Sequence, residues 1–199
     1  MKILGITGSS GAGKTLITNL FLKLESTYII NTDELAKKLA KKNSKYIKEI
    51  EESFGQEILL EDGNLNRKKL SEIISKDENS KNELNKITKN NLVPKMLQEI
   101  EKNSNKKLII LDIPILYENK LEVYCDKVLA IISKKEEQIK RICIRDNITK
   151  EQAENRLKIQ LSNEFFKQKA DYIIENYQKN ESELLKEITK IYEEIIKGE

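Results

Sequence analysis

Short apolar runs and longer helical stretches alternate along the chain. Five runs rich in β-branched residues cover positions 2–7, 28–30, 107–113, 127–132 and 171–176. Their side chains are apolar at successive positions, which is typical of strands that are buried on both faces. Because helical patterns separate most of these runs, the order predicts a parallel sheet covered by helices. We therefore expect a three-layer α/β fold with a five-stranded parallel sheet and helices on both faces.

Helical patterns fill most of the intervals between the predicted strands. The first starts in a glycine-rich loop and continues through Leu16, Leu20 and Leu24. A second covers about 33–54, two or more lie within 66–103, and a pair lies within 134–169. A last helix, over about 181–197, places its apolar residues on one stripe at helical spacing. This stripe predicts packing against the core, and a partner-binding face is the alternative.

Composition narrows the classes of partner. Basic and acidic residues number 36 and 33, and they interleave in segments such as KKEEQIKR at 134–141, which indicates solvated helix surface. A nucleic-acid-binding protein usually shows a basic excess on one face, so we expect no nucleic-acid partner. No apolar run approaches the ~18 residues of a membrane-spanning helix, and the first residues lack the apolar stretch of a signal peptide. We expect a cytoplasmic protein with no membrane segment.

The residue types present also limit the chemistry. The chain contains no histidine, so any general acid–base step must use a carboxylate, a lysine or a tyrosine. Cys125 and Cys143 lie far apart in the sequence and in apolar surroundings. We expect both to be reduced core residues, as is usual in a cytosolic protein.

A complete phosphate-binding motif follows the first predicted strand. Residues 8–15 read GSSGAGKT and match G-x-x-x-x-G-K-[ST], with a strand before the motif and a helix after it. Glycines let successive backbone N–H groups curl around a phosphate, and the helix directs its positive end at the same anion. Lys14 would reach the β- and γ-phosphates and the Thr15 hydroxyl would complete a Mg²⁺ shell. The motif predicts a nucleoside triphosphate site, and a glycine-rich structural turn is the alternative.

The loop alone does not decide between a nucleotide switch and a phosphoryl transferase. A GTP-binding switch would carry D-x-x-G, which is absent, and N-K-x-D, whose nearest match is NKIT at 85–88. A remodelling ATPase would carry an apolar strand ending in Asp-Glu, whereas the apolar run that ends at Asp112 continues with Ile-Pro. A binding-only module is therefore the weaker interpretation.

Arginine is used sparingly, and most of it lies in one segment. Only four of the 36 basic residues are arginine, and three of them are Arg141, Arg145 and Arg156. Arg141 and Arg145 are one helical turn apart, so they share a face. The guanidinium fork can hold two phosphate oxygens, which lysine cannot do. The cluster predicts a helical lid over transferring phosphates, and a solvated helix face is the alternative.

A carboxylate follows the second predicted strand at Asp33. Ligands of parallel sheets bind at the carboxyl ends of the strands, so this group is placed to accept a proton from an attacking hydroxyl. The alternative is that Asp33 only caps a helix that begins at Glu34. The pattern alone favours neither interpretation.

Together these features resemble the dephospho-CoA kinase family, which catalyses the last step of coenzyme A synthesis. The similar segments are GITGSSGAGKT at 5–15, NTDELAKKL at 31–39, the stretch from FGQEI to LSEII at 54–74, DIPILYEN at 112–119, and the stretch from QIKRI to YIIEN at 138–176. The last segment is the most specific, because unrelated phosphate-loop kinases do not share it. Three segments depart from the family pattern: Ser9 and Ser10 stand for Gly-Ile, Asn31 for aspartate, and Lys89–Asn90 for His-Pro.

The resemblance implies a single domain with a P-loop, nucleotide-kinase-like fold. Its core would comprise residues 1–54, 106–133 and 170–199, with acceptor-side helices over about 55–105 and a lid over about 134–169. The reaction implied is ATP-dependent phosphorylation of the ribose 3′-hydroxyl of dephospho-CoA, with ATP and Mg²⁺ as cofactors. Another nucleoside or nucleotide kinase is the alternative, and a GTP-binding switch is an outside alternative. We expect dephospho-CoA as the small-molecule partner, and a monomer or weak oligomer.

The resemblance also implies roles for individual residues. Asp33 would be the catalytic base, Lys14 and Arg141 would act on the transferring phosphates, and Thr15 would bind the metal. The ATP-binding residues would be Gly8, Gly11, Ala12, Gly13, Lys14, Thr15, Leu16, Arg145 and Asn176, with Asn176 near the adenine. The acceptor side would include Arg67, Pro114 and Glu118.

Overall fold

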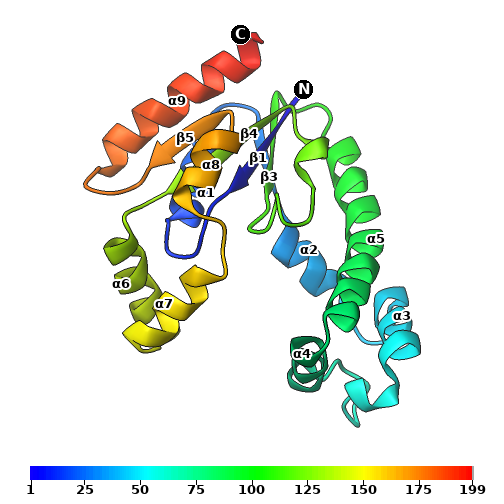
Figure 1. Cartoon of the computed structure of the whole chain (residues 1–199). Helices are drawn as coiled ribbons and strands as arrows, with labels where there is room; N and C mark the ends of the chain where they lie inside the picture. The colour runs from blue at the N-terminus through cyan, green and yellow to red at the C-terminus, as the bar shows by residue number, and fades with distance from the viewer. Residues whose placement is uncertain (199) are drawn as a thin grey trace. The chain divides into compact units, whose positions relative to one another are not determined.

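A computed structural model describes residues 1–198, and its elements follow the predicted alternation (Figure 1). The strands are β1 (Lys2–Thr7), β2 (Thr27–Asn31), β3 (Leu108–Asp112), β4 (Lys127–Ile132) and β5 (Tyr172–Glu175). The α-helices are α1 (Lys14–Phe21), α2 (Thr32–Leu39), α3 (Lys45–Phe54), α4 (Arg67–Lys76), α5 (Glu78–Lys102), α6 (Lys135–Asp146), α7 (Lys150–Lys158), α8 (Asn163–Lys169) and α9 (Glu181–Lys197).

The strands form one sheet with β1 at its centre. Within residues 1–198 the sheet has five strands in the order β2-β3-β1-β4-β5. β1 pairs in parallel with β3 and β4, and β4 pairs in parallel with β5. The predicted five-stranded α/β fold is confirmed. Since β1 is central, its carboxyl end delivers the glycine loop to the middle of one sheet edge.

The chain divides into two compact units. The first unit comprises Met1–Ile30 and the chain from Asn103 onward, and the second comprises Asn31–Lys102. The division differs from the sequence-based one, which assigned residues 31–54 to the core. The reason is packing within the second unit, where Ile50 of α3 clusters with Ile58, Leu70 and Ile87 from the segments that follow.

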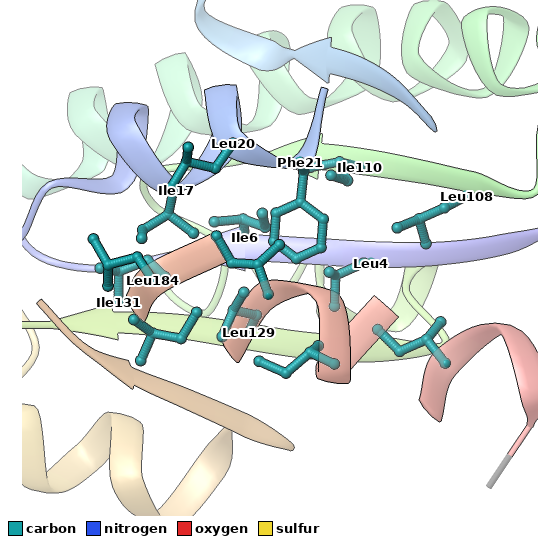
Figure 2. Close-up of a cluster of buried hydrophobic side chains, with 14 of the residues drawn as sticks. Leu4, Ile6, Ile17, Leu20, Phe21, Leu108, Ile110, Leu129, Ile131 and Leu184 are labelled. Carbon is teal, nitrogen blue, oxygen red and sulfur yellow. The ribbon is translucent and has the colours of Figure 1, made fainter. Parts of the chain in front are cut away.

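One face of the sheet in the first unit packs against α1 and α9. Figure 2 shows Leu4 and Ile6 of β1 beside Ile17, Leu20 and Phe21 of α1, all of them buried. The stripe predicted on the last helix joins the same cluster through Leu184, Ile188, Ile191 and Ile195. This helix therefore has its apolar face in the core, as predicted.

The other face of the sheet packs against α8. Ala130 and Ile132 of β4 cluster with Phe166, whereas their neighbours Leu129 and Ile131 belong to the cluster with α1 and α9. Successive side chains of a strand point to opposite faces, so β4 contributes to both layers. Helices therefore cover both faces, which confirms the three-layer arrangement in this unit.

In two segments the predicted number of helices was wrong. The pattern over 33–54 contains two helices, because the chain turns at Asn43 (φ 61°) and the Ser44 side chain caps α3 by accepting a hydrogen bond from the Ile47 N–H. The pair expected within 134–169 is three helices, because Asn147 ends α6 in a left-handed conformation and Ser162 caps the start of α8. Polar residues at these breaks resemble ordinary helix surface in a chain so rich in asparagine and lysine.

Two expectations from composition concern the burial of the cysteines and the presence of a membrane-spanning helix. Cys125 and Cys143 are free thiols, as expected, but both are only partly buried and so lie at the margin of the core. Burial raises the pKa of Cys125 to about 12. Among the helices of residues 1–198, none is both long enough and apolar enough to cross a membrane.

Candidate functional site

The glycine loop connects the central strand β1 to α1. Gly11 and Gly13 have positive φ values of 74° and 94°, a region that side-chain-bearing residues rarely adopt. Both also make close approaches: a Cβ on Gly11 would lie 2.6 Å from the Gln138 carbonyl oxygen, and one on Gly13 would overlap the Asn176 amide. No side chain caps α1 at Gly13, so its first N–H groups can receive an anion.

Lys14 forms an ion pair with Asp112 at the carboxyl end of the neighbouring strand β3. The two side chains are only 15% and 6% exposed. A buried charge is costly unless an opposite charge lies beside it, and here the ammonium and the carboxylate do this for one another. The structure thus places the Asp112 carboxylate directly at the loop. In the sequence this residue ends an apolar run and is followed by Ile-Pro.

Arg141 and Asn176 both hold the backbone of the loop. Arg141 donates from Nη1 to the carbonyl oxygens of Gly11 (3.1 Å) and Ala12 (3.4 Å), and from Nη2 to the carbonyl oxygen of Asn176 (3.1 Å). The buried Asn176 side chain donates from Nδ2 to the Ala12 carbonyl oxygen at 2.8 Å. Two side chains from α6 and from the end of β5 therefore meet at one carbonyl, which fixes that peptide group.

Two glutamines contact the serines of the loop. Gln138 of α6 donates to the hydroxyl of Ser9 and, at 3.2 Å, to the carbonyl oxygen of Ser10. Gln160, in the turn between α7 and α8, accepts from the Ser10 N–H (2.9 Å) and donates to the Ser10 hydroxyl (3.1 Å). Gln138 is only 4% exposed, so the interpretation of segment 134–141 as wholly solvated surface was wrong at this position.

The remaining arginines of the cluster meet at one carboxylate. Arg145 donates from Nε and Nη2 to the two oxygens of Asp146 at 2.7 and 2.8 Å, and Arg156 pairs with the same carboxylate. Hydrogen bonds from these two arginines lower the pKa of Asp146 to about 2. The Arg145 side chain is 59% exposed. In this structure Arg145 therefore contacts Asp146, whereas Arg141 contacts the loop.

Asp33 belongs to the second unit and lies in the first turn of α2. The helix begins at Thr32 and its cap is Asn31, whose side chain accepts a hydrogen bond from the Glu34 N–H at 3.0 Å. The interpretation of Asp33 as the cap of this helix was therefore wrong. An exposed carboxylate in the first turn also suits the helix dipole.

The other predicted residues lie at the ends of elements. Thr15 and Leu16 are in the first turn of α1, where Leu16 is 42% exposed and so does not join the core stripe. Pro114 follows β3 and its carbonyl oxygen accepts from the Thr7 hydroxyl at 3.1 Å. Glu118 lies in the segment after β3, and Arg67 is the first residue of α4 in the second unit.

Sequence reasoning missed three side chains that contact the loop. Asp112 was visible as the end of an apolar run and is the second candidate, after Asp33, for the general base, but its contact with Lys14 of the loop was not predicted. Gln138 and Gln160 carry no signal, because a glutamine among lysines and glutamates looks like helix surface. Within residues 1–198 no group of three or more cysteine, aspartate or glutamate side chains is arranged to hold a metal ion by itself.

Comparisons with known proteins agree on one family. The sequence model of the CoaE family, described as dephospho-CoA kinase, matches residues 2–182. A dephospho-CoA kinase of Fusobacterium nucleatum is 36% identical over 98% of this chain and 99% of its own length, and one of Listeria monocytogenes serotype 4b is 37% identical over 88% of both. The solved structure of dephospho-CoA kinase from Campylobacter jejuni is 28% identical, covers 98% of both chains and has a TM-score of 0.69.

Proposed function

Because the chain belongs to the dephospho-CoA kinase family, we propose that it transfers the γ-phosphoryl group of ATP to the ribose 3′-hydroxyl of dephospho-CoA, giving coenzyme A and ADP. The observation that carries this proposal is the complete phosphate loop, uncapped at α1 and braced by Arg141 and Asn176. Phosphoryl transfer depends almost entirely on positioning and on stabilising spreading charge, and a braced loop supplies the first.

The brace on Ala12 has a direct consequence for the ATP side. Arg141 and Asn176 both hold the Ala12 carbonyl oxygen. In a planar trans peptide the following N–H points the opposite way, so the Gly13 N–H is held toward the other side of the loop. Donors fixed in this way need no reorganisation as charge develops in the transition state. In our proposal Lys14 adds its charge to the same phosphates.

Thr15 and Asp112 would hold the metal ion. Mg²⁺ prefers oxygen ligands and keeps several waters, so one hydroxyl and one carboxylate beside the substrate phosphates suffice for it. Both residues adjoin Lys14, one in sequence and the other through the ion pair. When bound, the ion neutralises charge on the β- and γ-phosphate oxygens.

Asp33 would accept the proton of the attacking 3′-hydroxyl. Asn31 fills the capping role, and this supports the catalytic interpretation of the carboxylate that follows. The chain contains no histidine, which leaves carboxylates as the natural general bases here. We propose Arg67, Pro114 and Glu118 for the acceptor side, residues 134–169 for the lid, and Arg145 for ATP within that lid.

A panel of acceptors tests the function. Purified protein is given ATP and Mg²⁺ with dephospho-CoA, AMP, UMP, adenosine or pantetheine phosphate in parallel, and products are identified by mass. We expect phosphorylated product from dephospho-CoA. Product only from one of the other acceptors would instead make the chain a different nucleoside or nucleotide kinase.

Replacing Arg141 by lysine should lower turnover by about 10²-fold, the loss that a misplacement of about 1 Å in the reacting groups can cause. Its two terminal nitrogens span the carbonyl groups of Gly11, Ala12 and Asn176. A lysine ammonium is a single point on a flexible stem and cannot bridge them. Steady-state kinetics with ATP and dephospho-CoA measure the effect.

Arg145→Lys is the companion variant, because Arg145 lies on the same helix and contacts Asp146 in place of the loop. We expect a smaller loss of turnover from it. Unchanged kinetics in both variants would mean that neither arginine contributes to phosphoryl transfer. Melting curves of both proteins separate a loss of turnover from a loss of folding.

A further inference from the structure

Gln160 uses its whole side-chain amide on one residue of the phosphate loop. Its oxygen accepts from the Ser10 N–H and its nitrogen donates to the Ser10 hydroxyl, at 2.9 and 3.1 Å. Gln160 is 150 residues distant in sequence and lies in the short turn between α7 and α8. The contact therefore connects the far end of the proposed lid to a backbone donor of the loop.

The Ser10 N–H is a donor that a phosphate could also use. In loops of this kind the backbone N–H groups cradle the nucleotide phosphates, with the α- and β-phosphates near the start of the helix. Ser10 lies on the strand side of the loop, before Gly11 and Gly13, so a nucleotide with its α- and β-phosphates at the helix would bring its terminal phosphate toward Ser10. One N–H carries one hydrogen, and a charged phosphate oxygen is a stronger acceptor than a neutral amide.

The other contacts between the loop and the lid differ in kind. Gln138 is buried and donates to the Ser9 hydroxyl and to a carbonyl oxygen, so it occupies no N–H group of the loop. The backbone of α6 also lies against Gly11. Gln138 and the Gln160 turn line one pocket of about 410 Å³ together with Ser9 and Lys158, and most of its lining residues belong to the turn and the helix ends beside it. The turn has space beside it into which it can move.

On the basis of the proposed function, we propose that Gln160 is a positioning residue that senses the terminal phosphate of ATP. It holds the Ser10 N–H while the loop is empty or carries a diphosphate, and it yields that donor to the γ-phosphate of a triphosphate. The release frees the turn between α7 and α8, so the lid responds to ATP and not to ADP.

Two substitutions test the competition in opposite directions. Gln160→Ala removes the competing acceptor and should bind a non-hydrolysable triphosphate analogue of ATP about 2–10-fold more tightly, the range that corresponds to one net hydrogen bond. Gln160→Glu places a carboxylate against the phosphate and should weaken binding of the analogue. The affinity for ADP should stay unchanged in Gln160→Ala. Calorimetry with Mg²⁺ measures the affinities of the unaltered protein and of each variant for both nucleotides.

Gln168→Ala is the matched control, because Gln168 is an exposed glutamine of the adjoining helix α8. It should change neither affinity. Hydrogen exchange of the unaltered protein supplies a second readout: the triphosphate analogue should speed exchange in residues 157–163 relative to ADP. In Gln160→Ala the exchange should be fast with either nucleotide.

A structural role alone would produce different results. Equal changes in triphosphate and ADP affinity, or equal exchange in residues 157–163 with both nucleotides, would overturn the inference while leaving the proposed function intact. If the unaltered protein bound no nucleotide, the proposed function would fail, and this inference would fail with it.

Discussion

Replacing Lys14 by alanine should abolish measurable phosphoryl transfer and weaken the binding of ATP. The substitution removes the mobile charge that the loop motif directs at the β- and γ-phosphates. It also deprives the buried Asp112 carboxylate of its ion-pair cation. Loss of one partner from a buried pair costs about 3–5 kcal/mol, so the melting temperature should fall as well. Turnover, nucleotide affinity and thermal unfolding are measured on the same preparation.

A second substitution separates the two effects. In the double variant Lys14→Ala with Asp112→Asn, the buried charge is gone, so stability should recover in part while transfer stays absent. Lys23→Ala is the matched control, because Lys23 pairs with Glu181 at an exposed position just after α1. It should be nearly neutral, since exposed pairs contribute about 0–1 kcal/mol. Near-normal transfer in Lys14→Ala would mean that the loop is not the nucleotide site.

Replacing Asp33 by asparagine should lower turnover by about 10²–10⁴-fold, the contribution of a positioned general base. Asparagine has nearly the same shape but cannot take up the proton of the attacking hydroxyl. The cap of α2 is Asn31, so the substitution leaves the helix start unaltered and the melting temperature should hardly change. Binding of ATP and of dephospho-CoA should persist. Single-turnover rates and equilibrium binding measure the two properties separately.

Glu34→Gln is the control for Asp33→Asn, because Glu34 is the next residue in the same exposed first turn. It removes the same charge from the same end of the helix. If both variants keep turnover within a few-fold of the parent, the base must be sought elsewhere, and Asp112 is the first candidate. If both lose turnover equally, the first turn acts through its charge and Asp33 has no special role.

The sheet could be predicted closely because its signal is local. Residues 2–7 and 127–132 were expected as strands, and the observed bounds are Lys2–Thr7 and Lys127–Ile132. A strand buried on both faces has little freedom in composition. Helix ends were less predictable, since Asn43 and Asn147 take left-handed conformations that nothing distinguishes from the many other asparagines. Likewise, which of two helical leucines is buried depends on packing, as exposed Leu16 and buried Leu20 show.

The site could be predicted at positions where the conformation or charge of the loop allows only one residue type. The glycines and Lys14 are required by the conformation and charge of the loop, so the motif is visible in the sequence. The loop contacts of Gln138, Gln160 and Asp112 were not predicted, because their partners are backbone or side-chain groups far along the chain. Asn176 was expected on resemblance to lie near the adenine, and only the structure shows its amide on the Ala12 carbonyl. The adenine site remains a prediction.

The contacts that hold the loop also have a consequence for synthesis on the ribosome, because they can form only late. The loop is among the first segments synthesised, yet the Asn176 amide that holds Ala12 comes 164 residues later, and Gln160 comes 150 residues after Ser10. Contacts of such long sequence separation form late, because the intervening chain must first be brought together. A nascent chain therefore carries an unbraced phosphate loop through most of its synthesis. The Ala12 carbonyl oxygen gains both of its side-chain donors only after β5 has been synthesised and has paired with β4.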